Sequence, residues 1–138
     1  KDIDLDSAMD CVYGYAVGID FTRRDLQTIA KDNGRPWDLA KGFDQSAPIS
    51  AILPASEVGQ LDNRQISLKV NDETRQQASL SEMIWSVPEI ICELSKFFEL
   101  MSGDIIYTGT PSGVAAVSKG DRLSASVDGI ATLDFKIS

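Results

Sequence analysis

The chain has 138 residues, 43% of them hydrophobic, and its 13 basic and 21 acidic residues give a net charge of -8. This length predicts one domain, and the acidic balance argues against a nucleic acid or an anionic membrane as the main partner. No apolar run approaches the length of a membrane span, and no signal peptide is visible. Because the chain has no histidine, a general base near neutral pH must be a tuned carboxylate or lysine, a metal-bound water, or a residue outside the chain.

The N-terminal segment is predicted to hold one helical turn and a buried strand. Ser7 can cap a turn over 8–10, and residues 11–19 are nearly all apolar or small, which is typical of a strand covered on both faces. Cys11 and Cys92 each lie in an apolar run, which indicates buried thiols in a reducing, cytoplasmic compartment more than a disulfide. Since the chain begins without methionine and enters this strand almost at once, we expect it to be the trailing part of a longer polypeptide.

A charged helix is predicted to follow directly after Asp20, the last residue of this strand. Thr22 and Asp25 are spaced as a variant of the capping box. When the helix is extrapolated back through its cap, Asp20, Arg24 and Gln27 fall near one line, so a carboxylate, a guanidinium and an amide converge. This is the chemistry of a site for a cation and a carboxylic acid. The inward stripe of the helix would comprise Leu26, Ile29 and Ala30.

The middle of the chain is predicted to contain loops, a short strand and a hairpin. A turn cluster over 32–36 ends the helix. Residues 37–50 show no clean period and predict an ordered loop anchored by Trp37 and Phe43, with Lys41 between them. The expected elements that follow are a strand over 49–53, a polar loop over 54–65, and a hairpin with strands over 66–70 and 73–77 that turns at 71–72.

A second helix is predicted to begin at Ser86, because Ser86 and Glu89 form a capping box with Pro88 near the first turn. Apolar residues follow at helical spacing, which indicates an element of the core. We expect Ile91 to be the residue whose truncation lowers stability most. The six apolar positions are Val87, Ile90, Ile91, Leu94, Phe97 and Phe98.

The last third of the chain combines a glycine-rich loop with a hairpin. Residues 105–107 predict a short strand, and the two glycines and two threonines within 108–114 leave backbone amides and hydroxyls free to face a ligand. The loop lacks the Gly-Lys-Ser/Thr ending of a phosphate loop, so it does not predict nucleotide binding. Residues 122–127 and 130–137 predict two strands joined by an Asp-Gly turn.

Several of these stretches, in this order and at these separations, resemble the fumarylacetoacetate hydrolase family, and its acylpyruvate and fumarylpyruvate hydrolase branch most closely. Each stretch is weak alone, but together they span nearly the whole chain. By this resemblance, residues 1–138 form the C-terminal part of a catalytic domain. The stretches are Gly14 to Asp20 with Arg24 to Gln27, Trp37 with Ala40 to Asp44, Ser46 to Pro48, Leu68 to Asn71, Met83 to Glu89, and Gly103 to Val114.

The resemblance implies an α+β fold, a mixed β-roll with two main helices, and a two-fold dimer. It also implies a divalent cation, Mg²⁺ or Mn²⁺, held by three carboxylates, of which Asp20 is one. In such enzymes a Glu-x-Glu pair supplies the other two, and a His-Glu dyad activates water. Both lie upstream of this segment and are absent from the chain. We therefore expect it to contain only part of the site.

The activity that the resemblance implies is hydrolysis of a carbon-carbon bond in a 3-acylpyruvate, such as fumarylpyruvate or acetylpyruvate, as in the catabolism of aromatic compounds. Lys41 is the implied catalytic residue, because it would contact the substrate and neutralise an enolate. Arg24 and Gln27 would orient the substrate carboxylate. Thr110 would donate its hydroxyl and its amide to that carboxylate, and Gly109 is the other substrate-binding residue implied in this loop.

Other interpretations of these residues stay open at this point. Asp20 is also explained as a helix-cap acid, Lys41 as a surface lysine, and Arg24 as the partner of Asp25 in a salt bridge. Thr110 fits a turn whose shape alone matters. Decarboxylation of oxaloacetate, which uses the same cation and enolate, is the enzymatic alternative. A non-catalytic dimerising fragment is the alternative from another class of protein.

Overall fold

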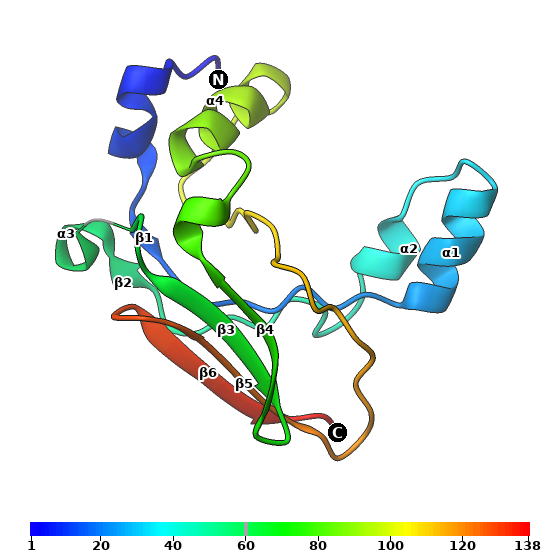
Figure 1. Ribbon diagram of the computed structural model, residues 1–138. Helices are drawn as coiled ribbons and strands as arrows, with labels where there is room; N and C mark the ends of the chain where they lie inside the picture. Colours follow the sequence, from blue (N-terminus) through cyan, green and yellow to red (C-terminus); the bar gives the residue numbers. More distant parts are fainter. Residues whose placement is uncertain (60) are drawn as a thin grey trace.

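The protein, a computed structural model that describes residues 1–59 and 61–138, has a mixed α+β fold with a four-stranded sheet and two projecting groups of helices (Figure 1). This confirms the predicted fold class, and α1 and α4 are its two main α-helices. Within the described ranges, no helix combines the length and the apolar character that a bilayer-spanning segment needs. The elements are η1 (Leu5–Cys11), β1 (Gly14–Tyr15), α1 (Arg24–Asp32), α2 (Asp38–Lys41), β2 (Leu53–Pro54), α3 (Ala55–Val58), β3 (Gln65–Val70), β4 (Glu73–Ser79), η2 (Leu80–Glu82), α4 (Val87–Phe97), β5 (Arg122–Val127) and β6 (Ala131–Lys136).

The main sheet has the antiparallel order β4-β3-β5-β6 and contains both predicted hairpins. In the turn between β3 and β4, Asn71 and Asp72 both have positive φ, 51° and 68°. Short Asn and Asp side chains tolerate this conformation, which matches the right-handed twist of the flanking strands. Gly129 takes the positive φ of the turn between β5 and β6. The local turn residues therefore set the register of both hairpins.

The hydrophobic core lies on one face of this sheet. Leu68, Ala125 and Leu133 stand in register on neighbouring strands and therefore share a face. Val17, which comes from the segment before α1, packs on this face with Ala125 and Val127. This face is called the inner face below. Because Val17 is 2% exposed, the segment that leads to Asp20 is fixed against the sheet.

The first strands are shorter than predicted. β1 pairs with β2 over two residues, and a lone bridge joins Gly18 to Ile49. Between them, the amide of Val17 donates to the hydroxyl of Ser50 (3.0 Å), and the amide of Ser50 donates to the carbonyl of Val17 (2.9 Å). The two continuous strands predicted here are wrong, because a serine hydroxyl replaces the backbone partner that a ladder requires.

α4 begins where the sequence predicts. Ser86 is the N-cap, and the Glu89 side chain accepts a hydrogen bond from the Ser86 amide (2.7 Å). The helix packs against η1. Ile91 is buried, as predicted, and so is Ser95, whose hydroxyl accepts a hydrogen bond from the amide of Ile3 (2.8 Å). The N-terminal segment is thus tied to α4 by both apolar and polar contacts.

Several apolar residues of α4 and η1 are more exposed than predicted. Phe97 and Phe98 are 76% and 61% exposed, Cys11 is exposed, and Cys92 is half-buried. Only one stripe of α4, centred on Ile91, is buried, and the two phenylalanines lie at the end of the helix beyond it. The prediction that all six apolar residues are core is wrong for this reason. The prediction that both thiols are buried is also wrong, since Cys11, at the end of η1, is exposed.

The cap of α4 makes stability depend on pH. The hydroxyl and the backbone amide of Ser86 both donate to the Glu89 carboxylate, and these bonds hold its pKa below the usual value of 4.5. Because the pKa of Glu89 is lower in the folded state than in the unfolded state, the ionised cap stabilises the folded protein. This stabilisation is complete at pH values above the unfolded-state pKa, and it is lost as the pH falls through the folded-state pKa. We expect Glu89→Gln to make the urea midpoint less pH-dependent between about pH 5 and pH 3. Equal pH slopes in the two proteins would contradict this.

α1 and α2 form an arm that extends away from the sheet (Figure 1). No side chain caps α1, so the capping box predicted at Thr22 is wrong. The predicted inward stripe is wrong at Ile29, which is 56% exposed because the arm extends away from the core. Trp37, predicted to anchor its loop, is 47% exposed. The loops predicted over 37–50 and 54–65 contain the short helices α2 and α3.

Residues 98–121 cross the edge of the sheet without forming a strand, so the strand predicted over 105–107 is wrong. This segment is held against β4 at Gly113, which has a φ of 100°. A Cβ at this position would lie 2.0 Å from the carbonyl oxygen of Arg75. Glycine is required here because both the conformation and the close approach exclude a side chain.

Candidate active site

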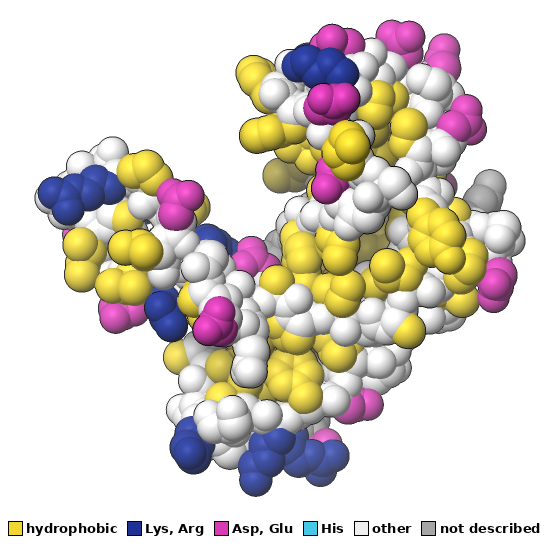
Figure 2. Space-filling model, turned by 180° about the vertical axis from the view of Figure 1, so that it is seen from behind, with side chains coloured by type: hydrophobic (Ala, Val, Ile, Leu, Met, Phe, Trp, Pro, Cys, Tyr) yellow, Lys and Arg dark blue, Asp and Glu magenta, His cyan; other side chains and the backbone are white. Residues whose placement is uncertain are grey.

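A groove of about 840 Å³ opens between the arm and the inner face of the sheet. It is lined by the segment before α1, by the end of α2, by β3 and β4, and by the 107–117 loop, and is called the central groove below. Figure 2 shows the molecule from behind, with the two lobes projecting on either side of a notch that is rich in hydrophobic side chains. The predicted site residues that line the central groove are Asp20, Arg24, Lys41, Gly109 and Thr110.

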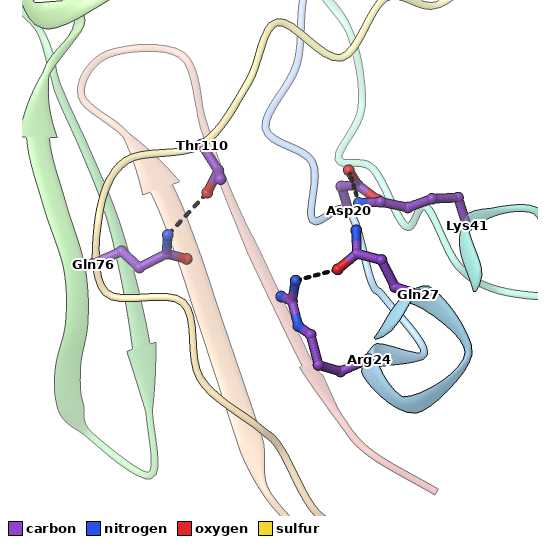
Figure 3. Close-up of polar contacts among 6 residues, drawn as sticks. All are labelled: Asp20, Arg24, Gln27, Lys41, Gln76 and Thr110. Atoms are coloured by element: carbon purple, nitrogen blue, oxygen red, sulfur yellow. Dashed lines mark hydrogen bonds and ion pairs between the residues drawn. The ribbon is translucent and has the colours of Figure 1, made fainter. Parts of the chain in front are cut away.

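Asp20 and Lys41 form an ion pair at the base of the arm. The Lys41 ammonium donates to Oδ2 of Asp20 at 2.7 Å, and Figure 3 shows the two side chains meeting from different segments. The Lys41 and Asp20 side chains are 35% and 49% exposed. An ion pair this exposed contributes little to stability, so its position beside the groove favours a role in binding over a role in folding.

Backbone hydrogen bonds hold this pair in place. On either side of Asp20, the amide of Ile19 donates to Pro48 (3.0 Å) and the amide of Phe21 donates to Ser46 (2.8 Å). The amide of Arg23 donates to the carbonyl of Ala40, the residue before Lys41, at 3.0 Å. The backbones that carry the carboxylate and the ammonium are therefore fixed relative to each other.

Arg24 and Gln27 lie one turn apart on α1. Nη1 of Arg24 donates to Oε1 of Gln27 at 2.6 Å, and both side chains lie on the side of the helix that faces Asp20 and Lys41 (Figure 3). In the part of the chain that the structure describes, Arg24 makes no salt bridge with Asp25 or with another acid. Gln27 does not line the central groove. Arg24 thus lies at the groove, and Gln27 lies beside it as its hydrogen-bond partner, on the side toward Asp20 and Lys41.

Tyr107 is a groove residue that sequence analysis did not single out. Its hydroxyl donates to the carbonyl of Ala47 at 2.8 Å, and its ring lies so close to Gly18 that a Cβ there would be 2.6 Å away. Burial, and to a smaller extent the negative charge of Asp20, raise the pKa of Tyr107. The phenol stays protonated and links the 98–121 segment to the segments that carry Asp20. The sequence signal was weak, because a tyrosine in a short apolar run is typical of packing.

Thr110 lies across the central groove from the arm, bonded to a residue that sequence analysis also missed. Nε2 of Gln76 donates to Oγ1 of Thr110 at 2.8 Å and to the carbonyl of Pro111 at 2.7 Å. Gln76 belongs to β4, and its side chain reaches the loop from the sheet (Figure 3). Nothing in the polar sequence of β4 distinguishes Gln76 from Gln77, so only the structure identifies it.

The donors among the described residues can be compared with the donor set that the implied cation needs. Among them, no group of three His, Cys, Asp or Glu side chains converges. Asp20 offers one carboxylate oxygen donor at the groove, which fits Mg²⁺ or Mn²⁺, because such ions use one or two carboxylates and complete their shell with water and substrate oxygens. The Asp20 carboxylate therefore fits the implied cation as a single ligand.

Comparison with known proteins gives the family of the chain. Residues 1–138 match the family described as fumarylacetoacetate (FAA) hydrolase C-terminal. The chain is 45% identical over 135 residues to a fumarylpyruvate hydrolase of Ralstonia sp, covering 98% of this chain and 70% of that protein. It is 44% identical over 137 residues to the mitochondrial oxaloacetate tautomerase FAHD2 of Oryza sativa subsp. japonica, covering 99% of this chain and 61% of the relative.

A solved structure extends the similarity to three dimensions. The crystal structure of fumarylpyruvate hydrolase from Pseudomonas aeruginosa in complex with Mn²⁺ and pyruvate is 48% identical, with a TM-score of 0.96. The match covers 99% of this chain and 58% of that one. The chain thus spans 58% to 70% of the length of these relatives. The match along its whole length shows that the chain belongs to the fumarylacetoacetate hydrolase family, in the C-terminal part that the family description covers.

Proposed function

We propose that this chain provides the substrate-binding part of a divalent-metal-dependent site that hydrolyses a carbon-carbon bond in a 3-acylpyruvate. The observation that supports this most is that the Asp20 carboxylate, the Lys41 ammonium and the Thr110 hydroxyl line one groove although they come from distant segments. The similarity to a fumarylpyruvate hydrolase, and to a relative solved with Mn²⁺ and pyruvate, supports the same substrate class.

The reaction requires stabilisation of a developing enolate. Water adds to the acyl carbonyl, the bond between that carbon and C3 of the pyruvate unit breaks, and its electron pair leaves on the pyruvate enolate. Protonation of C3 then gives pyruvate, and the acyl group leaves as a carboxylic acid. The Lys41 ammonium donates a hydrogen bond to the enolate oxygen, where negative charge appears only as the bond breaks.

The substrate carboxylate is bound from both sides of the groove. Arg24 uses one N–H of Nη1 for Gln27, and its other N–H groups are available to pair with a carboxylate. Thr110 donates its hydroxyl from the opposite side. Because Arg24 and Thr110 donate from two sides, they fix the orientation of the α-keto acid. Its keto oxygen then lies near Asp20 and Lys41.

The cation would complete this site. When bound, Mg²⁺ or Mn²⁺ supplies Lewis-acid stabilisation of oxygen atoms that gain negative charge. Asp20 is the residue of this chain that would hold it. This chain contains no histidine that could be the base that activates water. We propose that the base lies outside the 138 residues.

The complete encoded polypeptide, assayed with Mn²⁺ or Mg²⁺, is expected to convert acetylpyruvate or fumarylpyruvate to pyruvate and the corresponding acid. Loss of the enol absorbance of the substrate, coupled to pyruvate detection, measures this. The 138-residue chain alone is expected to show no turnover. Turnover by that chain alone would contradict the placement of the base, and no turnover by the complete polypeptide would contradict the function.

Oxaloacetate is the second candidate substrate. It carries the same α-keto acid unit, and relatives more than 40% identical are named oxaloacetate tautomerases. Its tautomerisation or decarboxylation passes through an enolate that the same Lys41 contact would stabilise. Conversion of oxaloacetate with no conversion of any acylpyruvate in the same assay would favour this function over the first.

A further inference from the structure

Gln76 is a buried polar residue on the largely apolar inner face of the sheet. It pairs with Leu68, which stands in register with Ala125 and Leu133, so its side chain shares the inner face with the core. Only 9% of Gln76 is exposed. A glutamine buried among aliphatic residues lowers stability unless its amide is bonded, so its presence here calls for a specific partner.

A bulge in β4 sets the position of this side chain. The register shifts between Leu68, which pairs with Gln76, and Lys69, which pairs with Thr74, so Arg75 has no opposite residue. The carbonyl of Arg75 is the atom that Gly113 approaches. A bulge redirects side chains locally, and here it presents both a carbonyl to the 107–117 loop and the amide of Gln76 to the same loop.

The hydrogen bonds of Gln76 determine which way the Thr110 hydroxyl points. The carbonyl of Pro111 can only accept, so the group that faces it must be the NH₂ of Gln76, and the second hydrogen of that NH₂ is directed to Oγ1 of Thr110. Oγ1 of Thr110 therefore acts as an acceptor toward Gln76. Its own single proton must point elsewhere, and Thr110 lines the central groove.

We infer that Gln76 is a positioning residue that turns the proton of the Thr110 hydroxyl into the central groove, where it donates to the substrate carboxylate. The inference rests on the proposed function, because it concerns the same carboxylate. Accepting from Gln76 uses one lone pair of Oγ1 and leaves the Thr110 proton for another partner. A carboxylate only accepts hydrogen bonds, so it is matched to a hydroxyl whose proton points into the groove. Gln76 also lines the central groove, but in this inference it acts on the substrate carboxylate through Thr110.

Three substitutions separate this role from simple attachment of the loop. Gln76→Glu replaces the donor by a carboxylate, which draws the Thr110 proton to itself and away from the groove. Gln76→Leu removes both hydrogen bonds, but the Thr110 hydroxyl can still rotate to donate its proton into the groove. Gln77→Glu is the matched control, because Gln77 is the neighbouring residue, is exposed and carries the same change of charge.

In the complete polypeptide, we expect Gln76→Glu to raise the KM of the acylpyruvate about tenfold with kcat changed less than about twofold, since one hydrogen bond to a charged group is lost. The dissociation constant of pyruvate in the presence of Mn²⁺, measured by calorimetry, should rise by a similar factor, and that of Mn²⁺ alone should not change. Gln76→Leu should have a smaller effect. The Gln76→Glu effect should shrink at low pH, where the protonated side chain can donate again.

The decisive comparison is made in a Thr110→Val background, where Gln76→Glu should have no further effect on KM or on pyruvate binding. Equal effects in both backgrounds, a Leu variant weaker in binding than the Glu variant, or a Gln77→Glu variant that matches Gln76→Glu would each overturn the inference. If the unsubstituted protein turns over the acylpyruvate while any of these results is obtained, the inference fails and the proposed function stands. If the unsubstituted protein shows no turnover, the proposed function fails.

Discussion

Lys41→Met is expected to lower kcat by about 10² to 10³, the range measured when one preorganised donor to a developing anion is removed. Methionine keeps the length and much of the volume of the side chain but cannot donate to the enolate. The change should appear mainly in kcat, because the contact strengthens only when charge develops. Steady-state kinetics of the complete polypeptide with acetylpyruvate and saturating Mn²⁺ measure it.

Lys31→Met is the matched control for this experiment. Lys31 lies near the end of α1, is exposed and does not line the central groove. It carries the same charge change and should leave kcat within about twofold. A Lys41→Met enzyme with unaltered kcat, or a Lys31→Met enzyme with an equal loss, would contradict the assignment of Lys41 as the residue that stabilises the enolate.

Asp20→Ala is expected to weaken Mn²⁺ binding by about 100-fold or more, since loss of residues that merely orient metal ligands already weakens binding 10- to 100-fold. The fold should be unchanged, because the Asp20 side chain is half exposed and its only ion pair, within the described residues, is with Lys41. Calorimetric titration of Mn²⁺ into the complete polypeptide measures the dissociation constant directly.

Thermal unfolding gives an independent check of the same role. A ligand that binds only the folded state raises its stability by RT ln(1 + [L]/Kd), so Mn²⁺ should raise the melting temperature of the unsubstituted protein and have much less effect on the Asp20→Ala variant. Asp32→Ala, at the exposed end of α1, is the control and should respond to Mn²⁺ like the unsubstituted protein. A metal titration that is unchanged in Asp20→Ala would refute the role of Asp20.

The elements that sequence analysis located well are those whose signals are local. Both hairpins of the main sheet are present because alternation of apolar residues and turn residues such as Asn71 and Gly129 act within a few positions. The start of α4 is correct for the same reason, since Ser86 and Glu89 are only three residues apart. Signals of this kind need no knowledge of the rest of the fold.

The wrong predictions concern residues whose environment depends on distant segments. Ile29, Phe97 and Phe98 have the spacing of core residues but are exposed, because burial requires a partner surface and the helical period cannot say whether one is present. The strand predicted over 11–19 failed because Ser50, about 30 residues away, bonds to Val17 in place of a ladder. Apolar periodicity therefore predicted the elements better than their packing.

The candidate site shows the same division. By itself, the sequence determined the family, the fold class and the residues of short motifs, Asp20 with Arg24 and the loop that contains Thr110, because these depend on the order of residues along the chain. Only the tertiary structure decided that the carboxylate, the ammonium and the hydroxyl line one groove, and that Gln76 directs that hydroxyl. The physical reason is that a hydrogen bond between residues 34 positions apart depends on a bulge in β4 and on a loop pressed against it, and neither is encoded by any local pattern.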